Sequence, residues 1–357
     1  MARQIFFSME RWKERLKRSI SDASVIANEL GLNAEEIERV SKTFPLRLTS
    51  RILSIIKATG GAKGPIGRQF IPTLEEFRES SDLLTDPLGE DPHSPCPNVV
   101  QRYPDRCMLY VSGGCAAYCR FCTRKRRVGC RSSIDDGELE EAFRFIETNT
   151  AIRDVLVSGG DPLLLDDDRL DAILTRLRAV PHVEIIRIGS RVPFSLPERI
   201  TKKLCRILRK HNPLYLNLHF NHPAELDEPA RHAVGRLADA GISLGSQTVL
   251  LRGVNDNSET MRTLMHELLK VRIRPYYLFQ CDLVRGTEHF RTPISTGIDI
   301  IRSLQGFTSG MAVPHFAVDT PGGVGKVPFV PNYVEGRDGK VVHLRVYDGK
   351  TVDYPDN

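Results

Sequence analysis

From residue 107 onward, short apolar runs alternate with stretches of helical period. The runs, bounded by Gly or Pro, are CMLYVSGG, DVLVSGGDP, VEIIRIGSR, PLYLNLHFNHP, SLGSQTVLLRG and RPYYLFQCD. Amphipathic patterns such as DRLDAILTRLRAV and ETMRTLMHELLKV lie between them. This alternation predicts an α/β fold whose parallel strands are buried on both faces. We expect a partial or full (β/α) barrel; a doubly wound open sheet is the alternative.

The remaining segments divide the chain into three expected parts. Residues 9–60 show helical spacing and are followed by TGGAKGPIGRQF, which we expect to be a glycine-rich connection. Residues 81–106 are rich in Pro and Asp and predict an extended linker. The expected parts are listed here: an N-terminal helical region with its linker (1–95), the barrel core (96–334) and a short tail (335–357). The tail predicts one β-hairpin that turns at Asp348-Gly349.

Composition narrows the class of protein. The chain is 41% hydrophobic and 27% charged, as globular proteins are. Its formal net charge of +5 does not call for a nucleic-acid partner. No apolar run is long enough for a membrane span, and the charged N-terminus does not resemble a secretory signal, so we expect a cytoplasmic protein. Eight cysteines in a chain of 357 residues are not a disulfide framework.

Polar side chains gather where the predicted strands end. In α/β barrels the active site is built at the carboxyl ends of the strands. A turn would explain any one of these residues, but every predicted strand ends in this way. The strand-end residues are Cys115, Ser158, Gly159, Gly160, Asp161, Ser190, Arg191, His219, Asn221, Gln247, Arg252 and Asp282.

Three cysteines follow the first strand with spacings of four and three residues: Cys115, Cys119 and Cys122. A structural zinc site is expected to have four protein ligands, and Cys130 could in principle be the fourth. Three thiolates that hold a [4Fe–4S] cluster instead leave one iron open for another ligand. Zinc and a group of unligated thiols remain the alternatives.

A second candidate site is the loop PGGVGK, which ends in Lys326. Its glycines permit tight turns and a close approach to a ligand. The loop lacks the spacing of a phosphate-binding P-loop, and no helical pattern follows it. A lysine on such a loop can form a Schiff base with a carbonyl cofactor such as pyridoxal 5′-phosphate (PLP).

The cysteine spacing after a first barrel strand resembles the radical S-adenosylmethionine (SAM) superfamily, and SGGDP resembles that superfamily's Gly-Gly-Glu strand. Together with CTRKRR, HFNHP, LLRGVND, RPYYLFQCDL and VDTPGGVGK, these motifs resemble the PLP-dependent lysine 2,3-aminomutase family. The resemblance extends from about Gly67 to Val334. It implies a partial (β/α)6 radical SAM barrel that uses a [4Fe–4S] cluster, SAM and PLP.

The family resemblance also implies a role for individual residues. Cys115, Cys119 and Cys122 would bind the cluster, and Lys326 would carry PLP. Arg102 and Arg106 would contact the PLP phosphate, since arginine suits phosphate. The residues expected to face SAM are Ser158, Gly159, Gly160, Asp161, Ser190, Arg191, His219 and Gln247. Arg124 would receive the substrate carboxylate, whereas Lys125, Arg126 and Arg127 are expected to meet solvent.

Two aspartates bear on the substrate. Asp282 and Asp319 match the pair that holds the ε-ammonium of lysine in this family, and two partly buried carboxylates need a cation between them. The resemblance therefore implies an isomerase that converts L-lysine to β-lysine. The alternatives are glutamate, another dibasic amino acid or a protein-bound lysine as substrate. A non-catalytic iron–sulfur electron-transfer protein and an RNA-modifying radical SAM enzyme are alternatives of other classes.

The chain departs from the family in its tail. The lysine mutases resembled have a C-terminal extension whose cysteines bind zinc across subunits, together with a further zinc cysteine just after GVND. Asn257 stands at that position, and the tail has no cysteine, so we expect no zinc. We further expect a homo-dimer, a reductant such as flavodoxin or ferredoxin, and neither a membrane nor a nucleic acid as partner.

Overall fold

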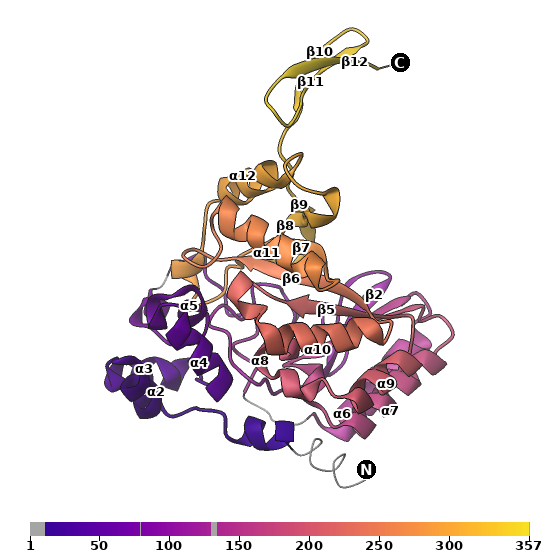
Figure 1. Cartoon of the computed structure of the whole chain (residues 1–357). Helices are drawn as coiled ribbons and strands as arrows, with labels where there is room; N and C mark the ends of the chain where they lie inside the picture. Colours follow the sequence, from indigo (N-terminus) through magenta and orange to yellow (C-terminus); the bar gives the residue numbers. More distant parts are fainter. Residues whose placement is uncertain (1–10, 79, 130–133, 357) are drawn as a thin grey trace.

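The computed structural model describes residues 11–78, 80–129 and 134–356, and it is built around one nine-stranded sheet (Figure 1). The strands follow one another in chain order across the sheet. β2 to β8 are parallel, while β1 and β9 pair antiparallel at the two edges. The strands are β1 Val99–Tyr103, β2 Arg106–Ser112, β3 Asp154–Gly159, β4 Ile185–Ser190, β5 Leu214–His219, β6 Ser243–Leu250, β7 Arg274–Gln280, β8 His315–Asp319 and β9 Lys326–Pro328.

Helices between the strands cover the outer face of the sheet (Figure 1). They are α6 Asp136–Thr148, α7 Asp167–Ala179, α8 Val192–Ser195, α9 Lys202–Lys210, α10 Glu228–Asp239, α11 Ser258–Lys270 and α12 Ile294–Leu304. Side-chain caps fix several starting points. Asp135, Thr201, Asp227 and Asn257 each accept a backbone N–H from the first turn. Each predicted helical pattern between strands is confirmed.

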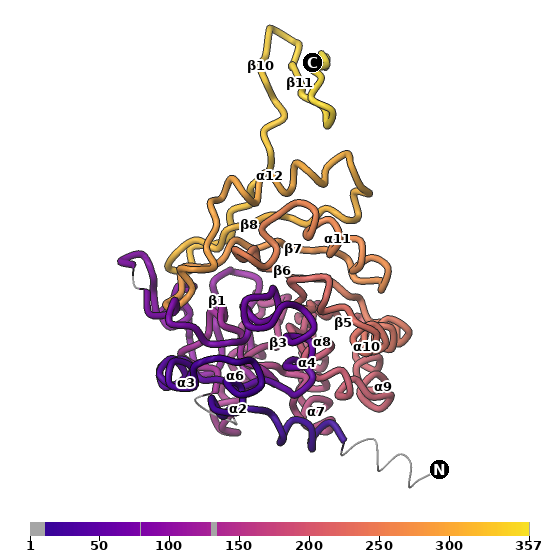
Figure 2. Tube along the Cα trace, turned by 60° about the vertical axis from the view of Figure 1, so that its left-hand side comes forward, coloured from indigo at the N-terminus to yellow at the C-terminus, as the bar shows by residue number. Residues whose placement is uncertain are grey.

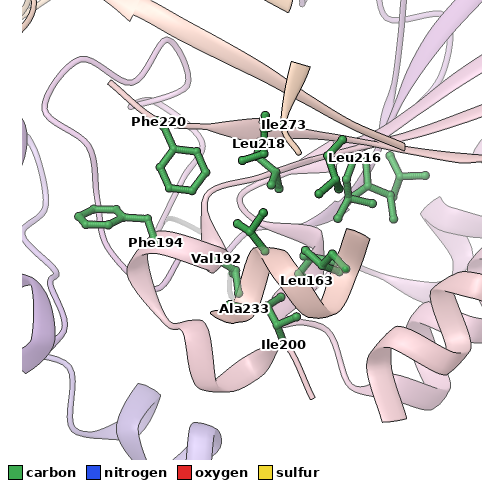
Figure 3. Close-up of a cluster of buried hydrophobic side chains, with 14 of the residues drawn as sticks. Leu163, Val192, Phe194, Ile200, Leu216, Leu218, Phe220, Ala233 and Ile273 are labelled. Atoms are coloured by element: carbon green, nitrogen blue, oxygen red, sulfur yellow. The ribbon is translucent and has the colours of Figure 1, made fainter. Parts of the chain in front are cut away.

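The core lies between the sheet and these helices. Figure 3 shows Leu218 of β5 on the side of the strand toward Val192 of α8, with Phe194 near Phe220. All four side chains are buried. The same apolar cluster continues into the N-terminal helices through residues such as Ile52. Side chains on the opposite face of the sheet line a large cavity, to which strands β2 to β9 contribute. The sheet is therefore a curled half-barrel with two edges, which confirms the predicted partial barrel.

The N-terminal region is helical, as predicted: α2 Ala23–Leu30, α3 Ala34–Thr43, α4 Ser50–Ala58 and α5 Pro65–Phe70. The expectation of a glycine-rich connection was wrong, because that segment forms a 3-10 turn, Gly61–Lys63, and then α5. A Cβ on Gly64 would lie 1.8 Å from the Thr59 carbonyl oxygen, and a Cβ on Gly67 would lie 2.1 Å from that of Gly61. These glycines serve close backbone packing.

The expectation of an extended linker was also wrong. Residues 84–94 pack against the barrel, and β1 follows them as an edge strand of the sheet. The backbone of Leu84 bonds to Leu283 at 2.8 Å, and Glu90 is only 3% exposed. This segment forms one wall of the site described below.

The C-terminal tail folds into a small antiparallel sheet that stands away from the barrel in both views (Figures 1 and 2). It has three strands instead of the predicted two: β10 Val334–Asp338, β11 Val341–Arg345 and β12 Thr351–Pro355. The predicted turn at Asp348-Gly349 joins β11 to β12, and Gly349 has a φ of 87°. No helix among the described residues is long and apolar enough to cross a membrane.

Candidate functional site

A cavity of about 1040 Å³ occupies the hollow of the half-barrel. The residues with an expected role in the site are spread over more than 200 positions of the chain, yet all of them line this cavity. They are Arg102, Arg106, Cys115, Cys119, Cys122, Arg124, Ser158, Gly159, Gly160, Asp161, Ser190, Arg191, His219, Gln247, Asp282, Asp319 and Lys326. The strand ends bring them together, as the parallel sheet predicts. Two other strand-end residues, Asn221 and Arg252, are not among the residues that line it.

The three cysteines lie on the loop after β2, and neighbouring backbone holds this loop in place. Tyr118 N donates to the Arg47 carbonyl at 2.8 Å, and Arg120 N donates to that of Gln69 at 2.9 Å. The thiols stand close enough together that burial, Asp161 and the other two sulfurs raise the pKa of Cys115. Such thiols are held as thiolates by iron.

The donor set of this loop fits a cluster. Among the described residues, no three Cys, His, Asp or Glu side chains meet closely enough to hold a single metal ion. A [4Fe–4S] cluster does not need three donors on one ion, because each thiolate binds a different iron. Cys130, considered above as a fourth ligand, lies outside the described residues.

A buried network of charged side chains anchors the cysteine loop to the N-terminal part of the chain. Arg120 donates to both carboxylate oxygens of Glu76 at 2.8 Å, and it also donates to the carbonyls of Phe44 and Pro45. Lys125 donates to the same carboxylate at 3.0 Å, and its side chain is 8% exposed. Burial alone would raise the pKa of Glu76, but Arg120 and Lys125 hold it below its ordinary value. The expectation that Lys125 meets solvent was wrong.

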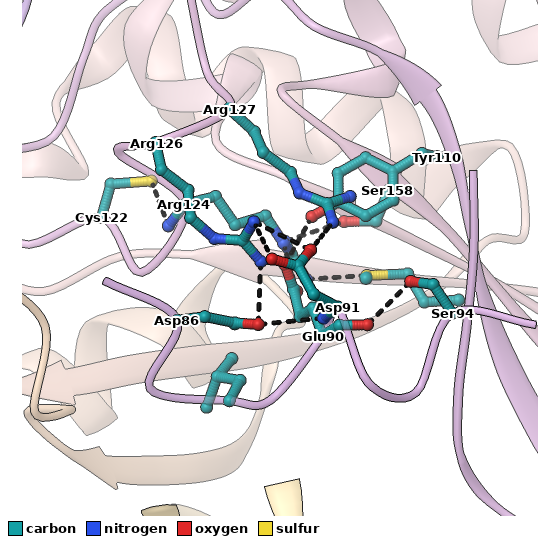
Figure 4. Close-up of polar contacts among 12 residues, drawn as sticks. Asp86, Glu90, Asp91, Ser94, Tyr110, Cys122, Arg124, Arg126, Arg127 and Ser158 are labelled. Atoms are coloured by element: carbon teal, nitrogen blue, oxygen red, sulfur yellow. Dashed lines mark hydrogen bonds and ion pairs between the residues drawn. The ribbon is translucent and has the colours of Figure 1, made fainter. Parts of the chain in front are cut away.

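The side chain of Arg124 lies beside the cysteines and is surrounded by polar contacts (Figure 4). Its Nε donates to Glu90 at 2.8 Å, and Tyr110 donates its hydroxyl to the other oxygen of Glu90 at 2.8 Å. The terminal nitrogens of Arg124 lie at Ser158 Oγ, 3.4 Å, and Met108 Sδ, 2.7 Å. Glu90 therefore fixes one edge of the guanidinium and leaves the other beside neutral groups in the cavity.

Arg126 and Arg127 form ion pairs with acidic residues (Figure 4), and Arg127, 31% exposed, still meets solvent as expected. Arg126 bridges Asp86 at 3.0 Å and Asp91 at 2.8 Å, and Arg127 contacts Asp91. The side chain of Arg126 is 18% exposed. These pairs tie the cysteine loop to residues 84–94.

The β3 end packs tightly on the cysteine loop. A Cβ on Gly159 would lie 2.2 Å from the Ser112 carbonyl oxygen, and one on Gly160 would lie 2.3 Å from that of Gly114. Asp161 accepts hydrogen bonds from Ser190 Oγ and from the backbone of the β4 loop, each at 2.8 Å. Burial raises the pKa of Asp161 to about 6. Asp161 thereby joins two adjacent strand ends.

A second buried network surrounds Arg191. Its Nη1 donates to Cys119 Sγ at 2.8 Å, and its Nη2 donates to Gln69 Oε1 at 2.6 Å and to the fully buried Glu225. Asn221 donates to Gln69 and lies 3.0 Å from His219 Nε2. Burial, together with Arg191, lowers the pKa of His219 to about 3, so that this imidazole is neutral.

Lys326 begins β9, directly opposite Asp319 in the antiparallel register. Its Nζ donates to Asp319 at 3.0 Å, and Arg102 donates to the same oxygen at 3.0 Å. The rings of Tyr277 and Phe279 stack with centroids 4.8 Å apart, and Lys326 Nζ lies 5.4 Å from the Phe279 centroid. An amine beside an aromatic wall, with arginines nearby, fits a flat phosphorylated cofactor such as PLP.

The lysine loop is held by close backbone contact with residues 84–94. Gly322 N donates to the Pro87 carbonyl at 3.1 Å. A Cβ on Gly323 would lie 2.3 Å from the Leu88 carbonyl oxygen, and Gly323 has a φ of 77°. Glycine is required here by both space and backbone conformation. Residues 84–94 therefore contact both the cysteine loop and the lysine loop.

Asp282 follows β7 and lines the same cavity as Asp319. Burial and the neighbouring carboxylate of Asp319 raise the pKa of Asp282 to about 7. Two carboxylates whose charges interact in a buried site favour a bound cation. The charges of Lys326 and Arg102 offset them only in part.

Sequence reasoning missed three buried acids: Glu76, Glu90 and Glu225. Each holds an arginine that belongs to, or contacts, the cysteine loop. Glu76 carried one local signal, since Thr73 and Glu76 have capping-box spacing, and the structure forms one half of that box, with Thr73 N donating to Glu76 Oε1 at 3.3 Å. Nothing local in the sequence marked the other two.

Comparisons with known proteins agree with this site. A family model described as Lysine-2,3-aminomutase matches residues 301–357, and one described as Radical SAM superfamily matches residues 109–265. An L-lysine 2,3-aminomutase of Fusobacterium nucleatum is 46% identical over 355 residues, covering 97% of this chain and 83% of that protein. One of Methanococcus maripaludis is 46% identical, covering 96% of this chain and 81% of that protein.

A glutamate 2,3-aminomutase of Clostridioides difficile is 40% identical over 349 residues, covering 97% of this chain and 82% of that protein. Identity at this level over nearly the whole chain settles the family. The chain belongs to the lysine 2,3-aminomutase family of the radical SAM superfamily.

Proposed function

We propose that this enzyme is an L-lysine 2,3-aminomutase, which moves the α-amino group of lysine to C3 and yields β-lysine. Family membership makes the chain an isomerase and implies a [4Fe–4S] cluster, SAM and PLP. The observation that supports lysine is the pair of carboxylates, Asp282 and Asp319, in the same cavity as Lys326 and the cysteines.

Each cofactor has candidate residues in the cavity. Cys115, Cys119 and Cys122 would hold the cluster, and Lys326, with Arg102 and Arg106, would hold PLP. SAM would lie along the strand ends, at Ser158, Gly159, Gly160, Asp161, Ser190, Arg191, His219 and Gln247. When bound, these groups supply the radical chemistry that makes the migration possible, while the protein supplies orientation.

The cavity carries charges of opposite sign at two places. Arg124 offers a cation for the substrate carboxylate, and Ser158 and Met108 beside it bring no competing charge. Asp282 and Asp319 offer anions for a side-chain ammonium. An amino acid held at both ends presents its middle carbons in one fixed orientation, which is how positioning lowers a barrier.

Glutamate is the weaker candidate, because its side-chain carboxylate would meet two carboxylates. Ornithine and arginine satisfy the same charges and differ in reach. We further propose the division into residues 1–95, 96–334 and 335–357, a cytoplasmic location, and flavodoxin or ferredoxin as the electron donor. A homo-dimer is supported by apolar side chains exposed on the tail sheet, at Val334, Val352 and Tyr354.

A panel of substrates tests the proposal. Anaerobic enzyme with SAM, PLP and dithionite should convert lysine at least about tenfold faster than ornithine, since one missing methylene costs that much. It should also convert lysine faster than arginine, whose guanidinium is larger than an ammonium. Glutamate should give no product. Chromatography of the β-amino acids is the measurement. Faster conversion of glutamate than of lysine would contradict the substrate assignment and leave the family unchanged.

The raised pKa of Asp282 predicts a pH dependence of lysine affinity. The ε-ammonium stays protonated up to about pH 10, so only the carboxylate changes charge near neutrality. As pH falls below about 7, Asp282 takes up a proton and lysine binding weakens. The expected loss approaches about tenfold per pH unit, the limit for one proton.

Lysine titration of the PLP absorbance from pH 5.5 to 8.5 measures this effect. Asp282→Asn is the matched variant, because it keeps the shape and cannot ionise. It should bind lysine weakly at every pH, with the dependence flattened. An unchanged slope in the variant would assign the titration to another group.

A further inference from the structure

The guanidinium of Arg191 contacts a sulfur of the cysteine loop. Its Nη1 donates to Cys119 Sγ at 2.8 Å. The side chain is 10% exposed, and its Cζ lies 4.8 Å from the centroid of the Phe70 ring and 5.3 Å from that of Phe121. A buried cation in direct contact with a thiol sulfur is therefore built into this side of the loop.

Acceptors on the other side of Arg191 fix its orientation. Nη2 donates to Gln69 Oε1 at 2.6 Å and to the carboxylate of Glu225 at 3.1 Å. Glu225 is fully buried, and it also accepts from Gln69 Nε2 at 2.9 Å and from Asn221 N at 3.3 Å. With its acceptors immobilised in this way, the guanidinium fork has one low-energy direction, and Nη1 points to the sulfur.

We propose that Arg191 raises the reduction potential of the cluster by donating a hydrogen bond to Cys119, with Glu225 as the positioning residue. The inference rests on the proposed function, in which Cys119 is a cluster ligand. Reduction adds one electron from a low-potential donor to the cluster and neither forms nor breaks a bond. A cationic donor at a ligand sulfur stabilises the more negative, reduced form.

Arg191→Gln tests the proposal in enzyme with a reconstituted cluster and no SAM. The measurement is a redox titration of the cluster followed by electron paramagnetic resonance. At a fixed solution potential, the ratio of reduced to oxidised cluster should fall about tenfold, which corresponds to about 59 mV for one electron. Arg191→Lys keeps the charge but not the fork, and it should give a smaller fall in the same direction. If Arg191→Gln does not fold, Arg191→Lys alone provides the test.

Arg199→Gln is the matched control. Arg199 is fully buried and pairs with Asp167 at 2.7 Å, and its other hydrogen bonds go to the carbonyls of Leu163 and Leu165. Its loss should destabilise the fold and leave the cluster potential unchanged. A general structural effect would shift both variants alike and would overturn the proposal.

Two further results would overturn it. The first is an intact cluster with an unmoved potential in both Arg191 variants. The second is an unmoved potential together with a weaker SAM affinity by titration, which would make Arg191 a SAM contact only. If wild-type enzyme takes up no iron at all, the proposed function itself fails, and a plain iron assay shows this before any titration begins.

Discussion

Replacing Lys326 with alanine is expected to lower the rate of β-lysine formation by about 10³-fold or more, since it removes the group that would hold PLP covalently. Among the described residues that line the cavity, Lys326 is the one lysine, and its Nζ lies 3.0 Å from Asp319. Borohydride treatment followed by mass measurement should find PLP fixed to the wild-type chain and not to the variant.

Lys340→Ala is the control for this experiment, because Lys340 is exposed between β10 and β11 and lies outside the cavity. It should keep full activity and covalent PLP. Circular dichroism should show both variants folded. Undiminished β-lysine formation by Lys326→Ala would show that the lysine loop does not have to hold PLP for activity.

Replacing Glu76 with leucine is expected to cost about 3–5 kcal/mol of unfolding free energy. The change leaves two buried cations, Arg120 and Lys125, without their carboxylate. Because Arg120 stands between Cys119 and Cys122, the cysteine loop should loosen, and iron retention should fall with stability. Urea unfolding and iron content per chain measure the two effects.

Glu267→Leu offers a matched comparison, since Glu267 also bridges two cations, Arg231 and Lys270, but at the surface. Surface ion pairs contribute about 0–1 kcal/mol, so this variant should lose little stability and no iron. Equal losses in the two variants would show that burial of the Glu76 network does not matter.

Local patterns in the sequence were enough to predict the barrel. The run that became β2 is apolar from Cys107 to Val111, and all five of these residues are buried, as expected for a parallel strand inside the fold. The strand-end positions then placed His219 and Gln247 in one cavity, since parallel strands share a carboxyl edge. Here a local pattern and a general topological rule sufficed.

Pairings between distant residues could not be predicted. Glu76 meets Arg120 across 44 positions, and Glu225 meets Arg191 across 34. Hydrophobic periodicity indicates which face of a helix or strand a residue occupies. It does not indicate which distant residue contacts that face. For the same reason Lys125 was expected in solvent: its charge was visible in the sequence, while the carboxylate that pairs with it was not.

The predictions for two segments, the glycine-rich segment before α5 and the tail, were wrong for different physical reasons. Gly64 and Gly67 look like a flexible connection by composition, but they are glycines because backbone carbonyls leave no room for a Cβ. The first strand of the tail, β10, is mostly exposed, so it lacks the alternation that marks a half-buried strand. Its pairing with β11 is seen only in the structure.

The central claim, amino-group migration within lysine, is tested most directly with L-lysine carrying ¹⁵N at the α-position. Anaerobic enzyme with SAM, PLP and dithionite should move the label to C3, and NMR should show ¹⁵N coupled to that carbon. The ε-nitrogen should stay unlabelled. Loaded enzyme that leaves the label on C2, or that yields unlabelled β-lysine, would contradict the account.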